Sequence, residues 1–204
     1  MNKILKNALI LMAITLVAGL DLGFTYDITK GPIAEQEQKA KEEAYQAVFA
    51  DASSYEALEL DAEAVQTLLA EAGYGAQEID EAMLAKDEAD AVLGVVMTVT
   101  SGEGYGGDIQ FAMGIQNDGT VNGIQILSIE ETAGLGMKAT EETFYGQFSA
   151  KKVDAFRYTK TGAASDNEID ALSGATVTTN AMVNGVNAGI VYFNSLVEGG
   201  VVSE

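Results

Sequence analysis

Hydroxyl side chains crowd the segment DALSGATVTT near the end of the chain, at Ser173, Thr176, Thr178 and Thr179. One of them could simply cap the helix predicted to follow, because a hydroxyl oxygen accepts hydrogen bonds from the free N–H groups at a helix start. A cap needs one hydroxyl, however, and the loop also keeps Gly174 and Ala175 small, so that a bulky group could approach the backbone. Free N–H groups and the positive end of the helix dipole favour a phosphate. The segment therefore predicts a helix cap or a phosphate site.

A second motif, GEGYGG, gives Gly102, Gly104 and Gly107 the spacing of a dinucleotide-binding fingerprint. That fingerprint must open a helix whose N-terminus holds the pyrophosphate. Here the next segment alternates apolar and polar residues as a strand does. We therefore interpret GEGYGG as a hairpin connection, with a loop close to a ligand as the alternative.

A third segment, EETAGLGMK at residues 130–138, combines small, apolar and basic residues. Gly134 and Gly136 permit a close approach to the backbone, Leu135 offers an apolar surface and Lys138 supplies a positive charge. Taken alone, this composition is typical of an ordinary turn after a strand.

The composition restricts the chemistry further, because the chain contains no histidine and no cysteine. Ser-His and Cys-His pairs, zinc sites with N/S ligands, haem or iron–sulfur sites ligated by these residues, and disulfides are therefore excluded. Redox work would need an organic cofactor or a metal held by oxygen ligands, and we predict no catalytic side chain and no metal ligand. The net charge of −20 disfavours nucleic acid as a partner.

The N-terminus predicts a membrane anchor over residues 1–28. Ala8 to Leu20 is almost wholly apolar, and the stretch extends over residues 7–26 across Asp21, about the length needed to span the hydrocarbon core. Lys3 and Lys6 precede it, so the positive-inside rule places the N-terminus in the cytoplasm and the rest outside. A cleaved signal peptide is the alternative.

Residues 29–90 are expected to form a helical connecting region. A helix should start at Gly31-Pro32, because proline is favoured in the first helical turn. A second helix is predicted from Asp61, as N-cap, to Ala72. The segment Ile79 to Lys86 fits a helix or a strand.

Residues 91–204 change to the pattern of an antiparallel sheet followed by a helix. Ala91 to Thr100 is β-branched, Ile109 to Ile115 alternates, and Asn117 to Gly119 is a strong hairpin signal. Thr178 to Val197 carries an apolar stripe at helical spacing, which should lie on the sheet. The chain is thus predicted to be α+β, an antiparallel sheet packed against helices with one N-terminal transmembrane helix.

The motifs of this chain resemble those of a known family. Asp170 to Thr176 reads D-A-L-S-G-A-T and is similar to the flavinylation motif D-x-x-[S/T]-G-A-T of FMN-binding domains, whose last threonine carries FMN through a phosphoester bond. With GYGG, NDGTVNGIQIL, ETAGLG and the N-terminal anchor, nearly the whole chain resembles the G subunits of Rnf electron transport complexes. The related C subunit of the sodium-pumping NADH:quinone reductase has the same domain.

The resemblance implies that Thr176 holds FMN covalently and that residues 91–204 form an FMN-binding domain. Neighbouring residues would give the ester room or line the flavin. These residues are Ser173, Gly174, Ala175, Glu131, Thr132, Gly134, Leu135, Gly136 and Lys138.

The implied function is that of a membrane-anchored subunit that carries electrons in an ion-translocating ferredoxin:NAD oxidoreductase complex. The folded domain would lie on the extracytoplasmic side of the cell membrane. Its partners would be other membrane subunits, and a separate flavin transferase would attach the FMN. A free-standing extracytoplasmic flavinylated reductase and a non-redox anchored binding module are the alternatives.

Overall fold

A computed structural model describes residues 2–202, which fall into two compact units that part between Ala40 and Lys41. The first unit is formed by α1 (Lys3–Val48), which continues into the second. Among the described residues, α1 is the one helix long and apolar enough to cross a membrane, by length and composition. The expected helix start at Gly31-Pro32 is wrong, because α1 runs through Pro32. A proline inside a helix removes one hydrogen bond, and the strong helix formers after it sustain the helix.

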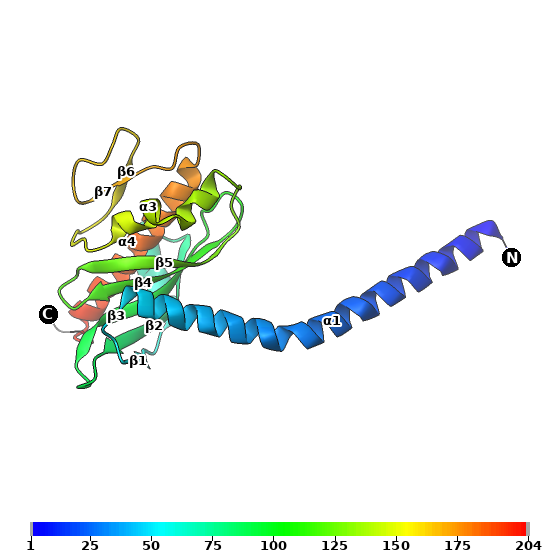
Figure 1. Cartoon of the computed structure of the whole chain (residues 1–204), viewed down its shortest axis with the longest axis horizontal. Helices are drawn as coiled ribbons and strands as arrows, with labels where there is room; N and C mark the ends of the chain where they lie inside the picture. Colours follow the sequence, from blue (N-terminus) through cyan, green and yellow to red (C-terminus); the bar gives the residue numbers. More distant parts are fainter. Residues whose placement is uncertain (1, 203–204) are drawn as a thin grey trace. The chain divides into compact units, whose positions relative to one another are not determined.

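The centre of the second unit is a five-stranded antiparallel sheet whose strands lie in chain order (Figure 1). This confirms the predicted α+β class. The strands are β1 (Ser54–Ala57), β2 (Gln77–Lys86), β3 (Val92–Ser101), β4 (Ile109–Gln116) and β5 (Val121–Ile129). The predicted hairpin joins β4 to β5, and Gly119 adopts the positive φ of 86° that this turn requires.

Residues 29–90 are not helical throughout, since β1 and β2 belong to the sheet. The ambiguity of Ile79 to Lys86 has a physical cause in the register of β2 on β3. A register shift between Ile79 and Glu81 interrupts the alternation of the strand. Ile79 and Ala82 are consequently both buried although they stand three residues apart, a spacing that imitates a helix. The predicted second helix is confirmed as α2 (Ala62–Glu71), with the Asp61 carboxylate accepting from the Ala64 N–H.

One face of the sheet is covered by α4 (Thr176–Glu198), whose apolar stripe is buried in the main core as predicted. Two glycines of α4 bring the helix close to the strands. A Cβ on Gly185 would lie 2.9 Å from the Phe111 ring, and one on Gly189 would lie 2.6 Å from Met113 Sδ. The helix that begins at Thr176 is therefore tightly fixed to β4.

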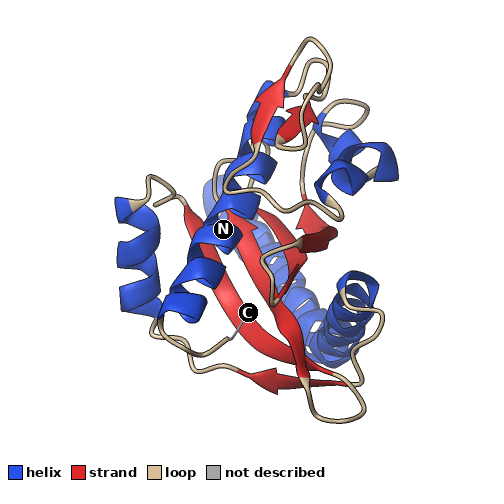
Figure 2. Cartoon of the chain, turned by 90° about the vertical axis from the view of Figure 1, so that its left-hand side faces the viewer, coloured by secondary structure: helices blue, strands red, loops and turns tan. Residues whose placement is uncertain are grey.

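The opposite face is covered by residues 41–49, so that helices lie on both faces of the sheet (Figure 2). The Phe49 ring lies where a Cβ on Gly94 or Gly114 would stand, at 2.7 and 3.0 Å. The Tyr45 hydroxyl hydrogen-bonds Thr98 Oγ1 at 2.8 Å, and Lys41 pairs with Glu81. Burial raises the pKa of the Tyr45 hydroxyl well above its ordinary value.

Short elements connect β5 to α4 and lie beyond the β5 edge of the sheet (Figure 1). They are η1 (Gly136–Thr140), α3 (Glu142–Tyr145), η2 (Gly146–Phe148) and the parallel pair β6 (Arg157–Thr159) and β7 (Glu168–Asp170). Phe144, Phe148 and Phe156 form consecutive edge-to-face aromatic pairs that hold this segment together.

Candidate functional site

A pocket of about 540 Å³ opens at the start of α4. Three segments that are far apart in the chain meet there: the β3–β4 connection, the turn after β5 and the first turn of α4. Its lining consists of Tyr105, Glu131, Thr132, Leu135, Gly136, Gly174, Ala175, Thr176, Val177 and Thr178. The hydroxyl-rich segment and the ETAGLG segment therefore face the same space, although the chain separates them by about 40 residues.

In the described part of the chain, no side chain caps the start of α4, so the capping role suggested for Ser173, Thr176 or Thr178 is wrong. Thr179 holds the loop instead, because its Oγ1 accepts from the Leu172 N–H and donates to the Ala175 carbonyl, both at 3.0 Å. The other hydroxyls of the segment make no hydrogen bond to any residue in the range 2–202.

The first amide groups of α4 are also without acceptors. Within the described chain, the N–H groups of residues 176–178 bond to nothing, and the first helical bond runs from Thr179 N–H to the Ala175 carbonyl. Such groups and the helix dipole attract an anion. The half-buried Thr176 hydroxyl thus lies at the pocket, beside a set of free donors.

Glu131 organises the other side of the pocket. Its Oε1 accepts from the Tyr105 N–H at 2.7 Å, which ties the GYGG loop to the turn after β5. The rest of its side chain lies over Gly136, where an added Cβ would stand 2.7 Å from Glu131 Oε2 and 2.6 Å from Thr178 Oγ1. Gly136 is therefore required by close packing under a carboxylate.

The rim of the pocket is apolar and open to solvent. Tyr105, Leu135 and Val177 are 74%, 42% and 48% exposed, and only Val201 among the other large apolar side chains of residues 41–202 is similarly exposed. Exposed apolar groups gathered around one hollow are typical of a ligand site.

The structure brings most of the predicted site residues together. Ser173, Gly134 and Lys138 do not line the pocket, although Gly134 and Gly174 both shape its loops through a φ of 75°. Tyr105, Val177 and Thr178 line it and were not among the predicted site residues. The sequence signal for Tyr105 was the GYGG loop, for which a place beside a ligand was the second interpretation.

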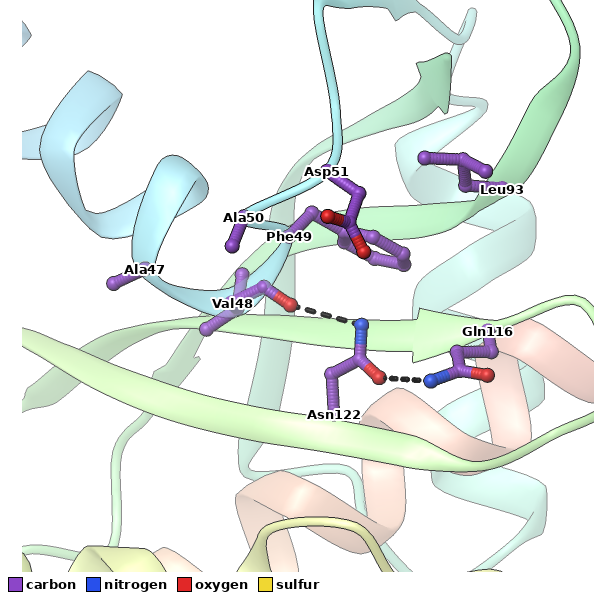
Figure 3. Close-up of a pocket in the computed structure, with 8 residues that line it drawn as sticks. All are labelled: Ala47, Val48, Phe49, Ala50, Asp51, Leu93, Gln116 and Asn122. Carbon is purple, nitrogen blue, oxygen red and sulfur yellow. Dashed lines mark hydrogen bonds between the residues drawn. The ribbon is translucent and has the colours of Figure 1, made fainter. Parts of the chain in front are cut away.

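A second pocket, of about 370 Å³, lies at the end of α1 (Figure 3). Two of its polar side chains, those of Asn122 and Gln116, bond to each other and to the helix. Asn122 Nδ2 donates to the Val48 carbonyl at 2.9 Å, and Gln116 Nε2 donates to Asn122 Oδ1 at 2.5 Å (Figure 3). These amides satisfy the last carbonyl of a helix, which indicates a structural role for the pocket.

Two family models match the chain. Residues 104–191 match the FMN-binding domain, and residues 1–48 match the RnfG N-terminal region. The first match contains the whole pocket lining.

Two curated relatives are similar over almost the full length. The G subunit of the Na⁺-translocating ferredoxin:NAD⁺ oxidoreductase complex of Acetobacterium woodii is 32% identical, with 95% of this chain and 93% of that protein aligned. The G subunit of the ion-translocating oxidoreductase complex of Vibrio cholerae serotype O1 is 30% identical, with 95% and 92% aligned. The crystal structure of Shewanella oneidensis NqrC is 21% identical and covers 57% of this chain and 60% of its own, with a TM-score of 0.49.

Proposed function

The chain belongs to the family of G subunits of ion-translocating oxidoreductase complexes, and from this premise we propose that it carries electrons through an FMN bound covalently to Thr176. The observation that carries the proposal is the Thr176 hydroxyl, which has no partner in residues 2–202 and lies at a pocket beside the free N–H groups of α4.

The residues present fit FMN. The amide groups of residues 176–178 suit a phosphate, and the absence of a side chain at Gly174 leaves room beside the ester. Tyr105, Leu135 and Val177 offer apolar surface to a flat aromatic ring. The pocket volume of about 540 Å³ is within the range of small-molecule sites.

When bound, FMN supplies the redox chemistry, and the protein supplies position and environment. Thr176 Oγ holds the phosphate, and the first N–H groups of α4 orient it. Leu135 and Val177 exclude water from the ring, while Glu131 holds the loop that carries Tyr105. Thr132 lines the same wall. Lys138 is exposed and outside the lining, so any role for it would be electrostatic.

The domain is proposed to lie on the extracytoplasmic side, anchored by the apolar part of α1. Lys3 and Lys6 before that stretch support a cytoplasmic N-terminus. A covalent tether is physically sensible there, because a cofactor that dissociated outside the cell would be diluted. The ester would be formed by a separate flavin transferase acting on residues 170–176, and the partners would be the other membrane subunits of the complex.

The test is the intact mass and the flavin fluorescence, after denaturation, of chain produced together with a flavin transferase. We expect wild type to gain the mass of FMN minus one water, Thr176→Ala to gain nothing, and the matched control Thr178→Ala to remain flavinylated. Flavin that persists on Thr176→Ala would move the attachment elsewhere. A colourless wild type would favour the non-redox binding module.

The complex is tested separately, by purifying the tagged chain from membranes in mild detergent. Recovery with several polytopic subunits supports the proposed assembly. Recovery of the flavinylated chain alone would support a free-standing reductase.

A further inference from the structure

A second carboxylate, that of Glu103, holds the residue directly before the GYGG loop. Glu103 Oε2 accepts from Gln77 Nε2 at 2.8 Å and from Asn184 Nδ2 at 2.6 Å. Gln77 opens β2, Glu103 stands in the β3–β4 connection and Asn184 is on α4. One carboxylate oxygen thus joins three elements.

Glu103 is itself half-buried, but its donor on β2 lies among buried polar groups that are incompletely satisfied. Gln77 is 1% exposed and its Oε1 has no hydrogen-bond partner among residues 2–202. The same holds for the hydroxyl of Ser101, which is 0% exposed. These two residues lie opposite each other on β2 and β3. Buried polar atoms without partners cost free energy, so the Gln77 amide is oriented toward Glu103 in spite of that cost.

Asn184 connects Glu103 to the helix that begins at Thr176. Asn184 and Thr176 stand about 12 Å apart along α4, at 1.5 Å per residue. Because α4 is packed closely on the sheet through Gly185 and Gly189, it is a rigid support. Glu103 therefore fixes the loop to the element that carries the attachment site.

Tyr105 is the residue that this arrangement places. Its N–H is held by Glu131, whereas its side chain is 74% exposed at the pocket rim. The Tyr105 side chain makes no hydrogen bond to any of residues 2–202. The position of the ring therefore depends on the backbone of the loop. That backbone is held through Glu103, two positions before Tyr105, and through Glu131, which accepts from the Tyr105 N–H itself.

We propose that Glu103 is a positioning residue that fixes Tyr105 over the flavin and thereby sets how far the flavin is open to solvent. The proposal rests on the proposed attachment of FMN at Thr176. Without the charge-assisted hydrogen bonds to Glu103, the ratio of molecules with the loop held in place to molecules with the loop released should fall by about tenfold.

The experiment uses the full chain, flavinylated and in detergent, and measures quenching of flavin fluorescence by iodide. We expect Glu103→Ala to raise the quenching constant most of the way to that of Tyr105→Ala. Glu103→Gln should largely restore the wild-type constant, because its amide oxygen still accepts from both donors. The double variant Glu103→Ala/Tyr105→Ala should have the same quenching constant as Tyr105→Ala alone. Both changes remove the cover that the Tyr105 side chain gives the flavin.

Two further variants separate positioning from general stability. Asn184→Ala removes the bond to α4 and leaves Glu103 in place, so it should also raise quenching even if Glu103→Ala folds poorly. Glu81→Ala removes a hydrogen-bonded carboxylate from the opposite face of the sheet and should quench as wild type.

The outcomes distinguish this inference from the function on which it rests. If every variant carries covalent flavin and both Glu103→Ala and Asn184→Ala quench as wild type, the positioning role is overturned and the attachment at Thr176 stands. If wild type carries no covalent flavin, the proposed function fails and this inference fails with it.

Discussion

Two pockets of the second unit, one at the end of α1 and one at the start of α4, differ in what their polar atoms do. At the end of α1, the Asn122 and Gln116 amides and the Val48 carbonyl satisfy one another. At the start of α4, the Thr176 hydroxyl and the first N–H groups have no partner in the described residues, and the rim of Tyr105, Leu135 and Val177 is apolar and exposed. Both pockets lie at a helix end, so a helix end alone does not mark a binding site. Unsatisfied donors beside exposed apolar surface do.

Close packing does not distinguish the two regions. Glycines admit Phe49 on one face of the sheet and α4 on the other, with similar separations. Substitutions at either pocket should therefore lower stability. Only substitutions at the start of α4 should also lower flavin content.

Apart from loss of the attachment residue itself, the largest effect is expected for Gly136→Ala. The new Cβ would stand within 2.8 Å of Glu131 and Thr178, so the Glu131 carboxylate must move and release the Tyr105 N–H. Covalent flavin content should fall by about tenfold or more, because a displacement of about 1 Å in the groups that line the pocket greatly slows attachment at Thr176. Gly146→Ala is the matched control, since its Cβ would meet nothing closer than 3.6 Å. Normal flavin content in Gly136→Ala would contradict the assignment of the pocket.

An intermediate effect, on stability alone, is expected for Asn122→Leu. The change leaves the Val48 carbonyl without its donor and Gln116 without its acceptor. The free energy of unfolding should fall by about 1–2 kcal/mol in urea titration. Flavin content should be unchanged. Gln125→Leu, on the same strand, is the control, because its amide makes no hydrogen bond within residues 2–202. Loss of flavin in Asn122→Leu would erase the distinction between the pockets.

The smallest effect concerns pH. Burial raises the pKa of Tyr45 in the folded state, so the folded chain holds this proton more tightly than the unfolded chain. The stability from the neutral hydroxyl is therefore complete below the unfolded pKa of about 10 and declines as pH rises above it. Tyr45→Phe cannot ionise there, so the stability difference between wild type and variant should narrow between about pH 9 and pH 11. A difference that stays constant over that interval would be incompatible with a buried, protonated Tyr45.

Local signals predicted much of the fold. Asp61 was identified as a cap because an acid precedes helix formers, and the β4–β5 hairpin followed from Asn117 to Gly119. The alternation of Ile109 to Ile115 placed one face of β4 correctly in the core. Each of these depends on neighbours in the chain, which sequence patterns record directly.

Features that depend on distant residues were not predictable in the same way. The bulge in β2 arises only from its pairing with β3. It interrupts the apolar–polar alternation by which a strand is recognised in the sequence. Tyr105 reaches the pocket because the β3–β4 connection lies beside Glu131, a contact set by the sheet. The ETAGLG residues were assigned by resemblance, since their composition alone indicated a turn. Covalent attachment at Thr176 remains a prediction.

The burial of the last turns of α1 has a practical consequence for anyone preparing the domain for crystallisation or electrochemistry. Ala44, Tyr45 and Val48 cover Val96 and Ala112 of the sheet, so the end of this helix is part of the soluble fold. A gene fragment designed to yield water-soluble protein should start at or before Lys41. A fragment that starts after Val48 would expose an apolar sheet face and aggregate during purification.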